Sequence, residues 1–201
     1  MADAKRSPLA FMTSALAEAE VPDAVALREL SPRTQIDLRG EVADPAFAGT
    51  VESALRLTLP RTPNRVADAG GLLALWLGPD EWLLVGPEAS DLEARLRSAL
   101  SGQHVAITDV SANRTVLELG GPKAREILNK GCPLDLDPRV FGPGQCAQSI
   151  LARAQLLLHQ RDIEPTYHLY VRGSFAFYAA SWLIDAMKEY RFAKRGGRRE
   201  R

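Results

Sequence analysis

Residues 72–87, LLALWLGPDEWLLVGP, contain the features that decide the fold. Two apolar runs, each with one tryptophan, flank the turn GPDE at residues 78–81. Glycine and proline favour a chain reversal, and the run that follows is typical of a strand. We therefore expect a buried hairpin, and because both runs are apolar throughout, we expect cover on both faces of its sheet. Only the two turn acids carry chemistry, so the stretch indicates a core rather than an active site.

Length and composition are typical of one large domain or of two small, fused ones. The chain has 201 residues, 46% of them hydrophobic, and its 25 acidic residues balance 25 basic ones. A chain of this size buries roughly 70% of its unfolded surface without disulfides or metals. Because the formal net charge is zero, the molecule as a whole is not suited to attract nucleic acid or an anionic membrane. Basic residues gather at the end, where we expect a disordered tail over residues 191–201.

Cysteine use and hydrophobicity indicate a cytoplasmic protein. Cys132 and Cys146 form no CxxC pair and have no histidine at ligand spacing, which excludes a disulfide framework and a zinc site. No apolar run approaches about 20 residues, and the N-terminus lacks a continuous apolar segment. We therefore expect neither a membrane span nor a signal peptide.

The first half of the chain is predicted to contain a helix and then an α/β unit. Apolar spacing predicts a helix within residues 7–20, so residues 1–24 form an N-terminal helical segment. The predicted elements that follow are strands at residues 25–30 and 34–39, a helix capped by Asp44-Pro45, the tryptophan hairpin, and a helix starting at Ser90 or Asp91. Residues 25–103 are therefore predicted to form the first unit.

The second half repeats this order. Its predicted elements are strands at residues 105–110 and 115–119, a helix ending at Lys130, strands at 146–152, 154–159 and 166–172, and a helix from Ser174 to about Tyr190. The period is about 80 residues, too long for a solenoid. We therefore expect an α+β fold of duplicated βαββα-type units, with residues 104–190 as the second unit and with helices covering one side of antiparallel sheets.

The sequence contains no recognisable catalytic motif. Its glycines form no GxGxxG or Walker pattern, and Ser111 lacks the glycines of a nucleophile elbow. The three histidines, His104, His159 and His168, are isolated, and we favour core or edge positions for them over metal ligation or general-base catalysis. Two interpretations are open for residues 120–122, GGP, before a helix: a tight turn, or backbone N–H groups that hold an anion.

Residues 109–115, DVSANRT, form the densest polar segment between apolar strands. The segment either caps its own backbone, or it projects Arg114 as a charged anchor toward a partner subunit or a ligand. Arg39 ends the strand at residues 34–39, whose alternation with apolar residues predicts one face that is wet or faces a polar partner. We take Arg39, Asn113 and Arg114 as candidate interface or anion-contact residues, and we assign no catalytic, cofactor-binding or metal-binding residue.

A series of segments, taken in order, resembles one family. The segments are LRG 38–40, DPAF 44–47, LP 59–60, TPN 62–64, WLGPDEWLL 76–84, DVSANRT 109–115, GP 121–122 with its helix, and GCPLDL 131–136. From about Ser7 to Tyr190 the combination resembles the gamma subunit of heterotetrameric sarcosine oxidase. The resemblance implies a fold similar to the folate-binding domain of the glycine-cleavage T protein, which agrees with the duplication.

The resemblance also implies a function that depends on other chains. It implies an assembly with alpha, beta and delta subunits that oxidises sarcosine to glycine, with formaldehyde or 5,10-methylenetetrahydrofolate and hydrogen peroxide as products. FAD, FMN, NAD, tetrahydrofolate and zinc are implied on the other subunits and not on gamma. We expect a non-catalytic structural subunit, with apolar side chains left over on the hairpin faces for its partners. The alternative is a free-standing T-protein-like folate-binding or regulatory protein of one-carbon metabolism.

Overall fold

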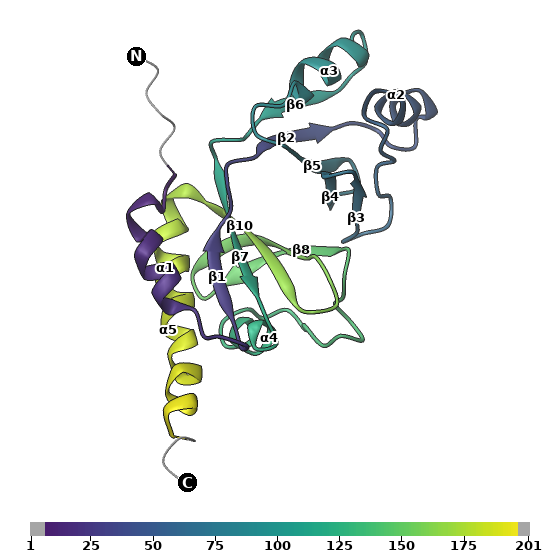
Figure 1. Cartoon of the computed structure of the whole chain (residues 1–201). Coiled ribbons are helices and arrows are strands. Elements are labelled where there is room, and N and C mark those ends of the chain that lie inside the picture. Colours follow the sequence, from purple (N-terminus) through teal and green to yellow (C-terminus); the bar gives the residue numbers. More distant parts are fainter. Residues whose placement is uncertain (1–6, 197–201) are drawn as a thin grey trace, which may run out of the picture. The chain divides into compact units, whose positions relative to one another are not determined.

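The structure, a computed structural model, describes residues 7–196, with side chains as far as residue 191. Two five-stranded antiparallel sheets and their helices make up the described chain (Figure 1). Contacts divide the described residues into compact unit 1, residues 7–30, 114–143 and 148–196, and compact unit 2, residues 31–113 and 144–147. The expected α+β class is confirmed.

Compact unit 2 contains the sheet β3-β4-β5-β2-β6. Its strands are β2 (Thr34–Arg39), β3 (Val66–Ala69), β4 (Leu72–Gly78), β5 (Glu81–Gly86) and β6 (Ala106–Asp109), and its helices are α2 (Pro45–Leu55) and α3 (Leu92–Ala99). The Asp44 side chain accepts a hydrogen bond from the backbone N–H of Ala46, and Pro45 is the first residue of α2, so the predicted cap is confirmed. The short edge strand β3 follows a proline-rich connection and was not predicted.

The tryptophan hairpin lies in the core of compact unit 2. β4 and β5 pair antiparallel with Trp76 opposite Trp82, and the ladder is irregular between Trp76 and Gly78. Trp82 is fully buried in a cluster that includes Phe47, whose ring centroid is 6.1 Å away. The predicted core hairpin is confirmed. Residues 73–75 and 82–85 are all buried, whereas Leu72, Trp76 and Leu77 are half-buried, so part of the apolar surface of the hairpin stays exposed.

Compact unit 1 contains the sheet β1-β7-β10-β9-β8. Its strands are β1 (Ala26–Glu29), β7 (Arg114–Gly120), β8 (Gln145–Leu151), β9 (Ala154–Gln160) and β10 (Thr166–Arg172), and β8 begins in compact unit 2. Its helices are η1 (Ala10–Met12), α1 (Thr13–Ala19), α4 (Ala124–Asn129) and α5 (Gly173–Gly196). Helix α5 packs on β7, β9 and β10 and lies beside α1 (Figure 1).

The two sheets share one topology, as the duplication predicts. The order β2-α2-β3-β4-β5-α3 along the chain recurs as β7-α4-β8-β9-β10-α5, and the sheet orders β3-β4-β5-β2 and β8-β9-β10-β7 correspond. Strands β2 and β7 begin at Thr34 and Arg114, which agrees with the period of the sequence. Each repeat therefore builds the same sheet, with one more strand after its first helix than the βαββα pattern has.

The edge strand of each sheet comes from the other repeat. β1 precedes β2 but pairs with β7, with Leu27 opposite Leu119, and β6 precedes β7 but pairs with β2, with Leu38 opposite Ile107. The predicted units, residues 25–103 and 104–190, follow the sequence repeat and differ from the compact units, which exchange their first strands. Hydrophobic alternation identifies a strand and its faces but not its neighbour, so the sequence did not reveal this exchange.

Helix α5 is longer than predicted. It continues to Gly196, so residues 191–196, expected in a disordered tail, are helical, while residues 197–201 lie outside the described residues. Near this end, the Tyr190 hydroxyl donates to Glu126 Oε2 at 3.2 Å, and Lys130 pairs with Glu189 at 2.8 Å. These contacts with Glu126 of α4 and with Lys130 just after it support α5 near its end.

Candidate interface residues and surfaces

Arg39 lies at the end of β2, beside the hairpin turn. Its guanidinium donates to Asp80 Oδ2 at 2.8 Å, with about half of each side chain exposed. The bond to Asp80, and then the charges of Asp80, Glu81 and Asp37, raise the pKa of Arg39. Burial, followed by the charge of Asp37, raises the pKa of Glu81. Three carboxylates around one guanidinium leave this site negative, which favours a basic or neutral contact over an anionic ligand.

Asn113 and Arg114 lie where the chain passes from compact unit 2 to compact unit 1. The exposed Asn113 donates its backbone N–H to the carbonyl of Val110 at 2.9 Å, and Ser111 donates its N–H to the Asp109 carboxylate at 2.8 Å. The loop thus caps part of its own backbone, which agrees with the first of the two interpretations. Arg114, half-buried, is the first residue of β7.

The candidate residues do not form one site within compact unit 2. Val110, three residues before Asn113, donates its N–H to the carbonyl of Gln35 near the start of β2, whereas Arg39 ends this strand. The four residue steps from Gln35 to Arg39 span about 14 Å of extended chain. Of the two alternatives for the polar face of β2, the wet one does not hold at Gln35, which is 1% exposed and donates its backbone N–H to the Ser111 hydroxyl at 2.9 Å.

A row of polar side chains crosses four strands of compact unit 1, and sequence reasoning missed it. The register places Arg28 opposite Glu118, Glu118 opposite His168, and His168 opposite His159. Glu118 accepts from Arg28 at 2.7 Å and lies 3.0 Å from His168 Nε2, and the two histidine rings meet edge to face at 5.9 Å. The residues come from separate strands, so no spacing in the sequence signals the row.

His159 is the buried end of this row, with 2% of its surface exposed. Among the described residues, its Nδ1 atom has no hydrogen-bond partner. Burial, followed by the charges of His168 and Arg161, lowers the pKa of His159 to about 3, so the imidazole is neutral near pH 7. Residues 7–196 contain no group of three or more His, Cys, Asp or Glu side chains that could hold a metal ion. We assign the row to sheet stability.

Both cysteines are free and buried. Cys146 Sγ lies 3.5 Å from the carbonyl oxygen of Trp76, and burial raises the pKa of its thiol to about 12. Cys132 Sγ lies 3.7 Å from the hydroxyl of Ser149. The Cys146 thiol is therefore not poised as a nucleophile.

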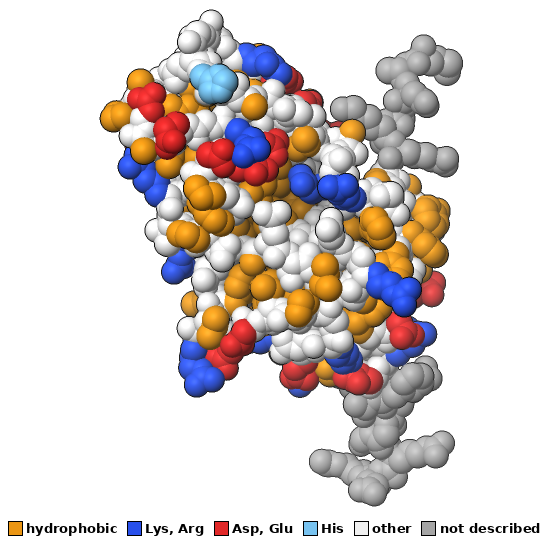
Figure 2. Space-filling view, turned by 180° about the vertical axis from the view of Figure 1, so that it is seen from behind, with side chains coloured by type: hydrophobic (Ala, Val, Ile, Leu, Met, Phe, Trp, Pro, Cys, Tyr) orange, Lys and Arg blue, Asp and Glu red, His pale blue; other side chains and the backbone are white. Residues whose placement is uncertain are grey.

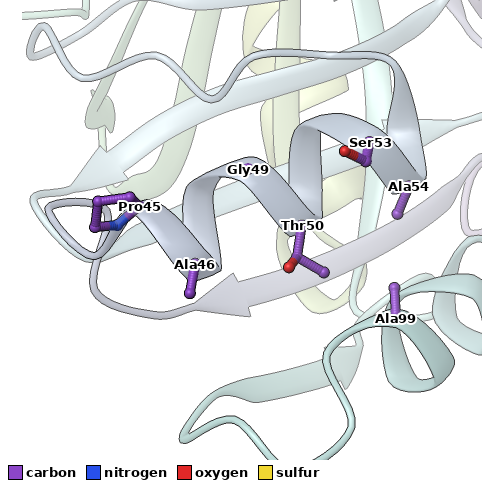
Figure 3. Close-up of a pocket in the computed structure, with 7 residues that line it drawn as sticks. All are labelled: Pro45, Ala46, Gly49, Thr50, Ser53, Ala54 and Ala99. Carbon is purple, nitrogen blue, oxygen red and sulfur yellow. The ribbon is translucent and has the colours of Figure 1, made fainter.

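An open groove of about 670 Å³ lies between α2 and α3 (Figure 3). Small side chains line it: Pro45, Ala46, Gly49, Thr50, Ser53, Ala54 and Ala99. Thr50 already accepts a hydrogen bond from Gln103 Nε2 at 3.3 Å. Ligand sites combine apolar walls with a few convergent polar or charged groups, and this lining has no charged or aromatic side chain. We assign it no ligand.

The helices of compact unit 1 expose large hydrophobic side chains. Across the described residues, the exposed large hydrophobics are Phe11, Val140, Ile150, Ile163, Phe175 and Phe177. The rings of Phe11 and Phe177 lie 5.7 Å apart. Figure 2 shows hydrophobic side chains gathered over η1, α1 and the start of α5, in the right-hand part of the view. No helix within residues 7–196 has the length and apolar character needed to cross a membrane.

The family of the chain follows from its sequence. The sequence profile described as "Sarcosine oxidase, gamma subunit family" matches residues 39–189. The chain belongs to this family. Two curated members, each named sarcosine oxidase subunit gamma, come from Arthrobacter sp. and Corynebacterium sp. (strain U-96). The Arthrobacter relative is 41% identical over 189 residues, which cover 92% of this chain and 91% of the relative. The Corynebacterium relative is 40% identical over 193 residues, which cover 94% of this chain and 93% of the relative.

Solved structures place the gamma subunit family among known folds. The heterotetrameric sarcosine oxidase from Corynebacterium sp. U-96, in complex with pyrrole 2-carboxylate, contains a chain that matches with a TM-score of 0.87 at 40% identity, covering 94% of this chain and 97% of that chain. The glycine cleavage system aminomethyltransferase T from Bartonella henselae matches with a TM-score of 0.60 at 19% identity. This match covers 84% of this chain and 48% of that chain. The resemblance found in the sequence segments is confirmed, and the second match supports the shared fold alone.

Proposed function

We propose that this chain is the gamma subunit of a heterotetrameric sarcosine oxidase, and that it is a non-catalytic subunit of this oxidoreductase complex. One observation carries the proposal: the match to a chain of the heterotetrameric enzyme, with a TM-score of 0.87 at 40% identity over 94% of this chain. The match extends over residues of both compact units, so it supports a shared role for the whole chain.

The reaction that we propose for the complex is the oxidative demethylation of sarcosine to glycine. Molecular oxygen accepts two electrons and becomes hydrogen peroxide, and water supplies the oxygen of the released formaldehyde. With tetrahydrofolate as acceptor, the carbon leaves as 5,10-methylenetetrahydrofolate. We place FAD, FMN, NAD, tetrahydrofolate and zinc on the partner subunits, alpha, beta and delta, and none on this chain. The support is the family resemblance, which the profile match over residues 39–189 carries.

We propose Arg39, Asn113 and Arg114 as contacts with partner subunits. The carboxylates around Arg39 support a basic or neutral group opposite it. In the complex, Arg39→Ala is expected to lower the recovery of this chain with its partners without changing its thermal midpoint. Arg139→Ala is the control, because Arg139 is also exposed and pairs with Asp137 at 2.8 Å. Equal recovery of both variants would remove Arg39 from the proposed interface.

A free-standing T-protein-like folate-binding protein is the second candidate. Its motive is the shared fold alone: the aminomethyltransferase matches with a TM-score of 0.60 at 19% identity, and the match covers 48% of that chain. Isothermal titration of the isolated chain with tetrahydrofolate separates the two candidates. Micromolar binding favours the second candidate, and the absence of binding heat favours the first.

Co-expression with the genes of the other three subunits tests the proposed function directly. We expect a complex with a flavin spectrum and sarcosine-dependent oxygen consumption, and we expect the chain alone to be colourless and poorly soluble or dimeric. A stable monomer that does not co-purify with the other subunits would contradict the proposal. We propose the cytoplasm as the compartment, and the two free cysteines support a reducing environment.

A further inference from the structure

Two helical segments of compact unit 1 carry no charge. Residues 7–17, SPLAFMTSALA, and residues 173–184, GSFAFYAASWLI, contain no Asp, Glu, Lys or Arg, although these types make up 25% of the chain. The segments adjoin in space, because α1 contacts α5 and Pro8 lies beside Gly173 at the start of α5. We call their exposed side chains the uncharged helical face.

Phe11 and Phe177 form the most exposed part of this face. Their exposed fractions are 73% and 56%, their ring centroids are 5.7 Å apart, and Phe175 on the same helix is 42% exposed. A phenylalanine side chain presents on the order of 200 Å², so the first two rings alone leave roughly 250 Å² in water. The largest apolar patch on a typical monomer measures about 300–600 Å² and is often functional, so the two rings supply a substantial part of such a patch.

Helix α1 has little stability of its own. It has seven residues, and no side chain of the described chain caps its N-terminus. Isolated helices shorter than about 12 residues are marginal in water, so the stability of α1 depends on the surfaces against which it packs. Leu16 and Ala19 face the interior, while Phe11 before the helix and Ala15 within it are exposed. The outer side of α1 therefore presents small, uncharged side chains such as Ser14 and Ala15, with the exposed Phe11 just before the helix.

Charged residues lie at the borders of the uncharged helical face. Glu18 and Glu20 follow at the end of α1, and Arg172 precedes α5. Beyond Ile184, Lys188 pairs with Asp185 at 2.7 Å. A centre depleted of charge within a polar, charged rim is the usual composition of a protein–protein interface.

We propose that the uncharged helical face docks this chain onto an apolar, charge-poor surface of another subunit of the sarcosine oxidase complex. The inference rests on the proposed function and specifies the surface that it uses. Charge complementarity decides the chemistry of the occupant: a charged surface seated here would lose its hydration and find no counter-ion, whereas an uncharged one loses little. We favour another subunit over a second copy of this chain because the matching relative is part of a heterotetramer.

Co-expression of the four subunits, followed by affinity purification through a tag on a partner subunit, tests the proposal. Phe177→Glu is expected to lower the recovery of this chain in the complex about tenfold or more, because it buries a charge at the centre of the interface. Phe11→Gln, a milder change, is expected to lower it less. Ile163→Glu is the control, since Ile163 is 86% exposed on the β9–β10 connection, away from both segments. Far-UV circular dichroism and thermal midpoints verify that the variants fold.

The outcomes separate this inference from the proposed function. If the wild-type chain assembles and Phe177→Glu assembles equally well, the face is not the docking surface, although the proposed function stands. Loss of self-association with full recovery in the complex would also overturn the inference and assign the face to a second copy. If the wild-type chain itself does not co-purify, the proposed function fails, and the inference with it.

Discussion

The indole N–H of Trp82 donates a hydrogen bond to the carbonyl oxygen of Pro60 at 2.9 Å. The bond links β5 to the proline-rich connection after α2, two segments that both belong to the family resemblance. Trp82 therefore fills the core of compact unit 2 and also satisfies a carbonyl of an irregular segment.

Replacing Trp82 tests these two roles separately. Trp82→Ala is expected to lower the free energy of unfolding by about 3–5 kcal/mol, because it leaves a large cavity. Trp82→Phe retains an aromatic ring but removes the donor to Pro60, and we expect a loss of about 1–3 kcal/mol. Urea denaturation of the isolated chain measures both. A thermal midpoint of Trp82→Ala equal to that of the wild type would show that the hairpin is not core.

Gly40 is required by the close approach of Phe47. A Cβ atom on Gly40 would lie 2.5 Å from the Phe47 ring, which is 2% exposed and has little room to move. Gly40→Ala is expected to destabilise the chain by about 1–3 kcal/mol through overpacking. Gly49→Ala is the matched control: Gly49 lies within α2 with nothing within 4 Å of an added Cβ, so this change is expected to stabilise by about 0.5–1 kcal/mol. Differential scanning calorimetry compares the two, and equal midpoint shifts would contradict the argument.

The lowered pKa of His159 predicts that the folded chain loses stability in acid. Its pKa is about 3 in the folded chain against 6.5 for an unperturbed histidine, so below pH 6.5 the unfolded state binds a proton that the folded state does not. The free energy of unfolding should therefore fall by about 1.4 kcal/mol per pH unit from pH 6.5 toward pH 3, which is about 2 kcal/mol at pH 5.

Two variants test whether His159 causes this pH dependence of the unfolding free energy. His159→Gln should reduce the difference in unfolding free energy between pH 7.5 and pH 5.0, whereas His104→Gln, at an exposed histidine, should retain it. Urea denaturation at the two pH values provides the measurement. The same pH dependence in the wild type and His159→Gln would exclude His159 as its source.

The cysteines are expected to resist labelling in the folded chain. Both are buried, and the pKa of Cys146 is raised to about 12. A thiol reagent at pH 8 should therefore label neither Cys132 nor Cys146 in native buffer, and both in urea, with the number of labels read by mass spectrometry. Rapid native labelling of one site would show that its segment opens locally.

Local chemistry predicted many elements of the fold. The turn between two apolar runs indicated the hairpin, strict alternation indicated β2, and Asp44-Pro45 marked the start of α2. The strand at residues 66–69 was missed because its four residues include the exposed Asp68 and lack a clear apolar pattern. The helical residues 191–196 were missed because their helicity follows α5, whose nearby residues are held by α4.

The candidate residues depended more strongly on tertiary structure. Arg39 and Asn113 were correctly located in strand-end and loop positions, but the sequence did not show that Asp80 pairs with Arg39. It likewise did not show that Glu118, His168 and His159 line up, or that Phe11 reaches Phe177. Each of these relationships joins segments whose spacing along the chain carries no periodic signal.

By itself, the sequence determined the family, the duplication and the core hairpin, because each depends on residue types at short spacing. Only the tertiary structure decided that the repeats exchange their first strands, that a polar row crosses one sheet, and that uncharged segments from the two ends of the chain adjoin. The physical reason is that strand pairing and helix packing select partners by surface complementarity, which is realised only when distant segments meet.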